Sequence, residues 1–309
     1  MKIYMAPMEG VTNYVFRKVY IKHFSGVDKF FTPFITPHMK KGFSKSELME
    51  LNSEYNKGQY LIPQILTNSA EDFLKLADEI EEMGYSEFNI NLGCPSGTVT
   101  SKGRGSGFLQ DPEALDRFFY EIFEKKDNIT ISVKTRIGFS DYGEWDDLLK
   151  VYKKYDFNEI IIHPRLRSDF YKNNIHLPSF TEACNTFKQN IIYNGDIKTL
   201  DDVNDLKTKI FDEKVTGIMI GRGLVRNPLL AESIKENIET ISIIRTIEFL
   251  DDIVEEYMSL GFGERNTLFK LKEIWGMIMG DDDRYVRILK KIRKSGGLKE
   301  YKTAINELY

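Results

Sequence analysis

The sequence predicts an α/β fold: a (β/α)₈ TIM barrel followed by a small C-terminal all-helical domain. Eight short apolar runs alternate with amphipathic stretches over about 235 residues, the size and order of such a barrel. The runs are nearly continuous in apolar side chains, which is typical of strands covered on both faces. The last part of the chain has helical periodicity only. An open dinucleotide-binding sheet is disfavoured, because no G-x-G-x-x-G follows the first run.

The expected strands are short and rich in β-branched or aromatic residues. In chain order they are Lys2–Pro7, Phe30–Phe34, Tyr60–Leu66, Glu87–Leu92, Thr130–Lys134, Glu159–His163, Asn190–Asn194 and Gly217–Gly221. Helical spacing of apolar residues is clear between them, as in Ala70–Met83 and Glu113–Phe123.

The final segment changes character after Asn227-Pro228. Helices are expected over Thr246–Leu260, Glu264–Met279 and Asp283–Lys294, the last beginning at the acidic run Asp281-Asp282-Asp283. We therefore divide the chain into a barrel domain, residues 1–238, and a helical domain, residues 239–309.

Composition restricts the class of protein. The 41% hydrophobic content suffices for a core, and no apolar run approaches the roughly 18 residues of a membrane span. The N-terminus MKIYMAPMEG lacks the features of a signal peptide. Two cysteines, Cys94 and Cys184, cannot form a disulfide framework, so a cytoplasmic protein is expected. No metal site and no obligate partner are indicated, and a monomer is expected. The net charge of −4 means that nucleic-acid binding would need a local basic patch.

Polar and ionisable residues follow at least seven of the expected strands at one end of the barrel, where barrel enzymes bind their ligands. These segments are Ala6–Gly10, Gln64, Asn89–Pro95, Lys134–Arg136, His163–Arg165, Asn194–Asp196 and Gly221–Gly223. Each has a structural explanation by itself: Gln64 as a satisfied core amide, Cys94 as a small apolar residue, His163 as a core imidazole. Their coincidence at one face favours a ligand site.

The last two expected strands indicate a phosphate site. Barrels often bind phosphate with the loops after their seventh and eighth strands. Here these are Asn194-Gly195-Asp196 and Gly221-Arg222-Gly223, where glycines admit an anion to the backbone and Arg222 supplies charge. Flavin mononucleotide (FMN) is a common barrel-bound cofactor that fits such a site. Lys134 and His163 would then lie along it, and Gln64 would bond the ring edge.

Taken in chain order, these strand-end segments resemble those of the tRNA-dihydrouridine synthase (Dus) family. The matching segments span the whole barrel: Ala6–Thr12, Phe16-Arg17, Gln64–Leu66, Asn89–Ser96, Lys102–Gly107, Val133–Gly138, Ile162–Arg165, Tyr193–Asp196 and Ile220–Gly223. Asn89–Pro95 with the glycine-rich loop after it is the most specific of them. One departure is His163-Pro164-Arg165, where the family more often has glycine in the middle and Pro164 removes a backbone donor.

The resemblance implies bound FMN, NADPH as the reductant, and a uridine of folded tRNA as the substrate. The implied cofactor residues are Pro7, Met8, Glu9, Gln64, Lys134, His163, Asn194, Gly195, Asp196, Gly221 and Arg222. Cys94 matches the proton donor of the family, and Asn91 and Arg136 match positions that contact the target base or the flavin.

The implied reaction reduces the C5–C6 double bond of uracil. Hydride passes from NADPH through FMN to C6, and a general acid on the other face protonates C5. Cys94 suits that role as a neutral thiol, whose unperturbed pKa is about 8.5. A cation too close would ionise it, so Lys134 and Arg136 are expected to face the base carbonyls and the flavin instead.

The helical domain contains the expected RNA surface. The segment Arg284–Lys299 contains seven basic residues and no acidic residue. The residues expected to bind RNA are Arg265, Lys270, Lys272, Arg287, Lys290 and Lys291. A phosphate-tracking surface would bind less tightly as salt rises. The alternative interpretation is an ordinary solvated helix face.

Three other functions remain open at this point. An FMN-dependent oxidoreductase for a small molecule, such as a dihydroorotate dehydrogenase-like enzyme, needs no basic helical domain. A lyase with Lys134 as a Schiff-base nucleophile leaves Cys94 and the phosphate loops unexplained. A non-catalytic RNA-binding barrel would need neither Cys94 nor the phosphate loops. The sequence does not indicate which uridine is reduced, or whether tRNA or ribosomal RNA is the target. Thr32–Phe34 and His38–Lys45 are expected on the substrate side.

Overall fold

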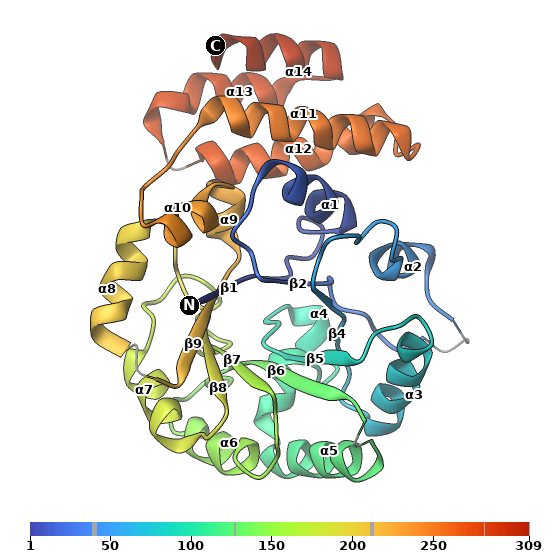
Figure 1. The fold of residues 1–309 in the computed structure, drawn as a ribbon, viewed down its shortest axis with the longest axis vertical. Coiled ribbons are helices and arrows are strands. Elements are labelled where there is room, and N and C mark those ends of the chain that lie inside the picture. Colours follow the sequence, from blue (N-terminus) through green and yellow to red (C-terminus); the bar gives the residue numbers. More distant parts are fainter. Residues whose placement is uncertain (39–41, 127, 211–212, 281, 309) are drawn as a thin grey trace.

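The computed structural model describes residues 1–309 except 39–41, 127, 211–212, 281 and 309, so part of the predicted His38–Lys45 segment lies outside the described residues. All named strands pair in parallel in one sheet with the order β3-β2-β1-β9-β8-β7-β6-β5-β4 (Figure 1). The strands are β1 (Lys2–Met5), β2 (Lys29–Phe31), β3 (Leu61–Ile62), β4 (Gln64–Ile65), β5 (Glu87–Leu92), β6 (Thr130–Arg136), β7 (Glu159–His163), β8 (Asn190–Tyr193) and β9 (Val215–Ile220). The predicted barrel is confirmed.

The predicted third strand is split by Pro63. β3 pairs with β2 on one side of this proline, and β4 pairs with β5 on the other. Proline donates no ladder hydrogen bond, so the regular strand stops there while the chain runs on. Because β3 and β4 are the two ends of the sheet order and adjacent in the chain, they close the barrel. The predicted second strand was too long: β2 ends at Phe31, two residues before Pro33.

Helices surround the strands (Figure 1). They are α1 (Tyr14–His23), α2 (Lys45–Leu51), α3 (Ala70–Glu81), α4 (Gly97–Thr100), α5 (Pro112–Lys125), α6 (Glu144–Tyr152), α7 (Leu177–Thr186), α8 (Leu200–Ile210), α9 (Arg222–Arg226) and α10 (Leu230–Glu236). The local sequence explains their ends: the Ser69 hydroxyl accepts from the Asp72 amide at the start of α3, and Asp111 with Pro112 begins α5.

Side chains fill the barrel interior. Tyr4, Phe31 and Met219 belong to an interior cluster, whereas Ile3 and Met5, on the other face of β1, pack against the helices. At the amino ends of the strands, the Lys29 ammonium is paired with Glu87 at 2.9 Å and with Glu159 at 3.1 Å. The interior is therefore a packed core, and ligand space is left to the carboxyl ends.

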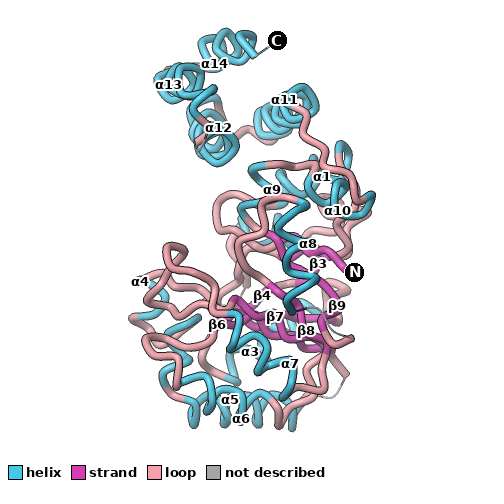
Figure 2. Tube along the Cα trace, turned by 90° about the vertical axis from the view of Figure 1, so that its left-hand side faces the viewer, coloured by secondary structure: helices cyan, strands magenta, loops and turns pink. Residues whose placement is uncertain are grey.

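The described chain after β9 is helical, with α11 (Ile243–Ser259), α12 (Glu264–Met279), α13 (Val286–Lys294) and α14 (Leu298–Ile305). α11 packs on α1 and α12 packs on α9, while α13 and α14 lie farther from the barrel (Figure 2). The prediction of α12 was correct at both ends. The predicted helix Asp283–Lys294 begins with a 3₁₀ turn before α13, and Asp281 of its acidic cap lies outside the described residues.

None of the helices in the described chain combines the length and the apolar character that crossing a membrane requires. Within the same residues, no group of three or more His, Cys, Asp or Glu side chains is arranged to hold a metal ion.

Candidate active site at the carboxyl ends of the strands

A cavity of about 430 Å³ opens at the carboxyl ends of the strands. It is lined by all the predicted cofactor and catalytic residues and by two of the predicted substrate residues: Pro7, Met8, Glu9, Gln64, Asn91, Cys94, Lys134, Arg136, His163, Asn194, Gly195, Asp196, Gly221 and Arg222. Pro33 and Phe34 from the loop after β2 also line it, as do Glu273 and Met277 from α12. A more open groove of about 600 Å³ at the amino ends of β6, β7 and β8 contains none of the predicted residues.

Side-chain amides form a hydrogen-bonded chain across β4, β5 and β6. The Asn91 amide donates to Gln64 Oε1 at 2.7 Å, Gln64 Nε2 donates to Asn89 Oδ1 at 2.8 Å, and Asn89 donates to Ser132 at 2.9 Å. The amide orientation of Gln64 is therefore set by both neighbours. Its second N–H and second lone pair remain for a ligand.

Asn91 also holds the turn that contains Cys94. Its Oδ1 accepts from the amides of Gly93 at 3.1 Å and Cys94 at 3.0 Å. From the other side, the amide and hydroxyl of Ser106 donate to the Cys94 carbonyl at 3.1 and 2.8 Å. Gly105 has φ +56°, and a Cβ there would lie 2.9 Å from the same carbonyl oxygen. The glycine-rich loop is needed because it packs directly on the cysteine turn.

Burial raises the pKa of the Cys94 thiol above its ordinary value. A hydrogen bond from the Ser96 amide, and after it the positive charges of Lys134 and Arg136, act in the opposite direction without outweighing burial. Both cations thus act electrostatically on the sulfur, in addition to the expected role toward the base carbonyls and the flavin. The protonation state agrees with the sequence-based expectation, because a raised pKa leaves a neutral thiol that can donate a proton.

Lys134 carries a strongly perturbed cation at the cavity. Burial, followed by the nearby Arg136 guanidinium, lowers its pKa from 10.5 to about 7. Among the described residues, its ammonium has neither a hydrogen-bond acceptor nor an ion-pair partner. A buried ammonium with unused donors facing a cavity is suited to an anionic or carbonyl-bearing ligand.

The Arg136 guanidinium holds two loops together. Its Nε donates to the Gly93 carbonyl at 2.9 Å, Nη1 to Leu166 at 2.8 Å and Nη2 to Phe170 at 2.9 Å. A further side-chain hydrogen bond joins Arg136 to Tyr171, so most of its five N–H groups are used within the protein. This gives Arg136 a positioning role beside the base contact that the sequence suggested.

Tyr171 was missed by the sequence analysis. Its ring lines the cavity, with its centroid 5.3 Å from the Arg136 guanidinium and 4.7 Å from that of Arg222. The preceding residue, Phe170, has φ +50°, an uncommon conformation for a bulky residue. The sequence feature that could have identified Tyr171 is the concentration of arginine and aromatic residues after β7. The position of its ring, however, depends on the path of the loop.

Two arginines meet one carboxylate at the predicted phosphate end. Asp196 Oδ1 accepts from Arg165 Nη1 at 3.0 Å and from Arg222 Nη2 at 2.9 Å. Although burial acts to raise it, the hydrogen bond and charge of Arg165 hold the pKa of Asp196 below its ordinary value. Asp196 therefore orients Arg222 beside the cavity.

His163 is neutral in this setting. Burial lowers its pKa well below the ordinary value, and the charges of Arg136, Lys134, Arg165 and Arg222 add to the effect. Its Nε2 lies 3.2 Å from Arg165 Nη1. Because a guanidinium only donates, Nε2 accepts and Nδ1 carries the proton.

Glycines allow close backbone packing at the same end. A Cβ on Gly223 would lie 2.1 Å from the Ile197 carbonyl oxygen, and one on Gly195 would lie 2.7 Å from the Tyr193 hydroxyl. At Gly221 the nearest atoms would be 3.4 Å away. The first amides of α9 have no acceptor within the helix. Together with Arg222 they form an environment suited to an anion.

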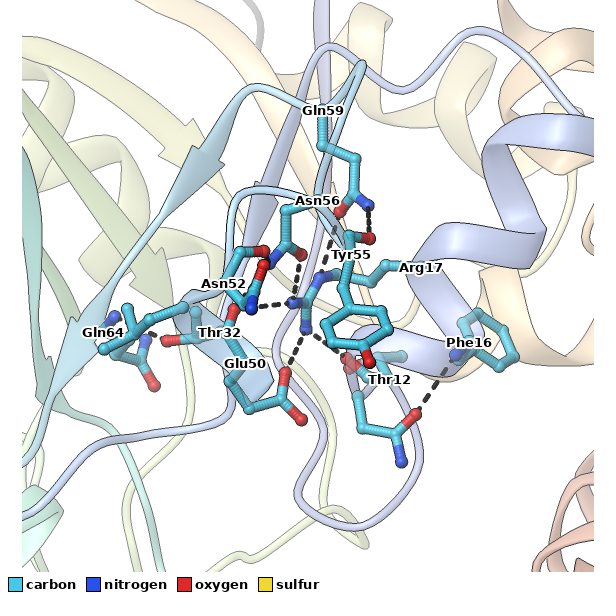
Figure 3. A network of polar contacts seen from close by, with 12 residues as sticks. Thr12, Phe16, Arg17, Thr32, Glu50, Asn52, Tyr55, Asn56, Gln59 and Gln64 are labelled. Carbon is cyan, nitrogen blue, oxygen red and sulfur yellow. Dashed lines mark hydrogen bonds and ion pairs between the residues drawn. The ribbon is translucent and has the colours of Figure 1, made fainter. Parts of the chain in front are cut away.

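The loop after β1 is fixed by a buried arginine (Figure 3). Arg17 is 0% exposed, and its guanidinium donates to the Thr12 carbonyl at 3.0 Å, to Glu50 at 2.8 Å and to Asn56 at 2.9 Å. The Thr12 hydroxyl in turn accepts from the Met8 amide at 2.8 Å. This network connects α1 and α2 to the loop that presents Pro7, Met8 and Glu9 to the cavity.

The six basic residues predicted to bind RNA do not line the cavity. Lys270 donates to the Gly10 carbonyl at 2.7 Å, Lys272 donates to the Ser295 carbonyl at 2.6 Å, and Lys291 is paired with Glu307. The side chains of Arg265, Arg287 and Lys290 are exposed.

The fold and the site define a barrel enzyme whose cavity, at the carboxyl ends of the strands, has one end suited to an anion and holds a thiol that can donate a proton. Similar folds occur in morphinone reductase (TM-score 0.55, 11% identity, 78% of this chain and 87% of that one) and in the old yellow enzyme homologue of Zymomonas mobilis (TM-score 0.51, 11% identity, 79% and 91%). At such identities only the fold is shared.

The dihydrouridine synthase (Dus) family model matches residues 4–260, and the chain belongs to this family. A probable tRNA-dihydrouridine synthase of Staphylococcus epidermidis is 32% identical over 243 residues, covering 74% of this chain and 70% of the relative. Probable tRNA-dihydrouridine synthase 2 of Bacillus subtilis is 28% identical over 261 residues, covering 82% and 78%. The resemblance read from the motifs is confirmed.

Proposed function

We propose that this protein is an FMN-dependent tRNA-dihydrouridine synthase that uses NADPH to reduce the C5–C6 double bond of uridine. The observation that carries the proposal is the buried Lys134 ammonium, which has no partner among the described residues, beside the protonated Cys94 thiol in a cavity with one end suited to an anion. Membership of the Dus family and the names of the relatives support the same substrate class. We further propose that it acts as a monomer in the cytoplasm.

The donor set fits a ligand with a phosphate at one end and a flat polar ring at the other. Arg222, the Nδ1–H of His163 and the amides after β8 and β9 suit the phosphate. Gln64 and Lys134 offer free donors to the ring, with Pro7 and Met8 as apolar wall. When bound, FMN would supply the hydride for C6 of uracil after its own reduction by NADPH.

Cys94 would supply the proton. As C6 gains hydride, charge develops toward C5 and O4, and the C5–H bond forms as the S–H bond of Cys94 breaks. The raised pKa keeps the proton on sulfur until then, while Lys134 and Arg136 stabilise the thiolate that results. The thiolate would regain its proton from solvent before the next turnover.

Asn91 and Arg136 would contact the base with the donors that the protein leaves free. Asn91 keeps one amide hydrogen, and Arg136 keeps one N–H group beyond its bonds to Gly93, Leu166, Phe170 and Tyr171. The uracil carbonyls are acceptors for such donors. Because both residues also hold the cysteine turn, base binding and proton-donor position would be coupled.

The helical domain, residues 239–309, would dock the RNA. On α13 the exposed residues Arg287, Lys290, Arg293 and Lys294 share one face at helical spacing, and the helix has no acidic residue. Lys291, which is paired with Glu307, and Lys272, which caps a carbonyl, would contribute less. Binding should weaken as salt rises.

Lys134 also meets one requirement of the lyase alternative, since a pKa of about 7 leaves half of the amine neutral at neutral pH. A Schiff base would be detected by borohydride trapping with a carbonyl substrate. The anion end and Cys94 have no role in that reaction.

The first test is the visible spectrum of the purified protein, followed by anaerobic addition of NADPH. Flavin bands that NADPH bleaches are expected, and a colourless protein that FMN cannot reconstitute would overturn the cofactor assignment. The second test is uridine reduction in tRNA by Cys94→Ala. Turnover should fall about 100-fold or more while flavin content and its reduction persist. Cys184→Ala is the matched control, because Cys184 is buried on α7 outside the cavity.

A further inference from the structure

Phe269 is an exposed aromatic residue at the edge of the cavity. Its side chain on α12 is 72% exposed, and no ring or cation packs on it among the described residues. A single exposed apolar residue is ordinary in soluble proteins. The position of this one, on α12 between the cavity-lining Glu273 and the exposed Arg265, distinguishes it.

One face of α12 leads from the cavity to Phe269. Glu273 and Met277, which line the cavity, follow Phe269 at intervals of four residues and so lie on neighbouring turns of the same face. The next residue, Lys270, donates to the Gly10 carbonyl at 2.7 Å and so holds this turn against the loop after β1. The ring of Phe269 therefore lies about one helical turn beyond the cavity wall.

Positive charge lies along this face of α12 on both sides of the ring. Arg265 is exposed one turn earlier on α12. Gly276 shares this face two turns after Phe269, next to the cavity-lining Met277, and a Cβ on it would lie 3.6 Å from Arg293 Nη2, so a basic side chain of α13 reaches the cavity end of the face. Neither arginine has an ion-pair partner within the described chain. Basic groups beside a free aromatic ring are the combination by which proteins bind unpaired nucleotides.

We infer that Phe269 is a stacking platform for an unpaired base of the RNA, adjacent to the uridine that enters the cavity. The inference rests on the proposed function. A uridine that leaves its stack deprives its neighbour of a stacking partner, which a protein ring can replace. The carboxylate of Glu273 lies between the ring and the cavity and repels phosphate, so a base rather than the backbone meets the ring, while the exposed Arg265 one turn before the ring offers a phosphate contact.

The test compares the flavin-loaded wild type with Phe269→Ala and Phe269→Tyr on an unmodified tRNA transcript. The alanine variant should bind about 5- to 150-fold more weakly, as loss of one stacked base predicts, and tyrosine should restore binding. The slope of log K against log salt should not change, because the ring neutralises no phosphate. Flavin content should be unaffected. Tyr120→Ala is the matched control, since Tyr120 is 59% exposed on α5, remote from α12 (Figure 1).

A second readout detects the stacking directly. A tRNA-derived stem-loop with 2-aminopurine beside the target uridine should lose fluorescence when it binds the wild type and Phe269→Tyr, and retain it with Phe269→Ala. Affinity of Phe269→Ala within twofold of the wild type, with normal uridine reduction, overturns this inference alone. A change of oligomeric state without loss of RNA affinity also overturns it, in favour of a second copy covering the ring. Failure of the wild type both to bind tRNA and to retain flavin overturns the inference together with the proposed function.

Discussion

Replacement of Lys134 by methionine should stabilise the flavin-free protein while abolishing its affinity for flavin. The ammonium is buried at the cavity without a partner in the described chain, so its charge costs free energy until a ligand neutralises it. Methionine has a similar length and no charge. The same change removes the donor that we assign to the flavin.

The magnitude follows from the pKa difference. Lys134 has a pKa of about 7 in the folded protein against an ordinary value of 10.5, so below pH 7 the folded state loses up to about 5 kcal/mol through this group. Between pH 7 and 10.5 the unfolded chain binds more protons than the folded one, so stability rises with pH. At pH 9 about 2 kcal/mol of the penalty remains. Lys134 is partly exposed to the cavity, and solvent screening makes these values upper bounds.

The assay is urea unfolding of deflavinated wild type and Lys134→Met at pH 6 and pH 9, in a buffer without phosphate. The advantage of the variant should shrink by as much as about 3 kcal/mol between these pH values. Changes in packing cancel in this comparison, because they do not depend on pH. An advantage that is equal at both pH values would refute the assignment of a buried, destabilised ammonium.

Three further predictions concern other parts of the site. Gly105→Ala places a Cβ 2.9 Å from the Cys94 carbonyl oxygen at φ +56°, so tRNA turnover should fall at least tenfold with flavin content retained; normal turnover would show that the cysteine turn tolerates displacement. Arg17→Met leaves a buried carboxylate without its partner and should reduce the free energy of unfolding by about 3–5 kcal/mol, measured by urea unfolding; a loss below 1 kcal/mol would contradict the network in Figure 3. Lys290→Ala with Arg293→Ala should weaken tRNA binding and reduce its salt slope by up to about two, whereas an unchanged slope would exclude this face of α13 from phosphate contact.

Much of the barrel was predictable because its signals are local. Runs such as Glu159–His163 are apolar on both faces, and α12 was predicted at both ends by apolar spacing between glycines. The site residues were predictable as a set because polar groups at strand ends meet at one edge of a parallel barrel. Their placement around one cavity is consistent with that expectation, while their roles remain proposals.

The hydrogen-bond and ion-pair partners of the site residues were not predictable from the sequence. The sequence suggested base contact for Arg136 and Asn91, but it does not show that their side chains are largely occupied in holding the Cys94 turn. It offered Lys291 as an RNA contact, whereas Glu307 on a later segment pairs with it. The ring of Tyr171 comes from a loop whose path depends on contacts with Arg136 and Arg222.

The sequence by itself determined the class of fold, the family and the identity of the groups that surround the cavity, because strand periodicity and motif spacing are properties of neighbouring residues. Only the tertiary structure decided that Cys94 remains a thiol and that Lys134 is destabilised. It also decided that Phe269 stands free beside the cavity. The physical reason is that burial and through-space charge depend on residues far apart in the chain, which only the closed barrel and the helices packed on it bring together.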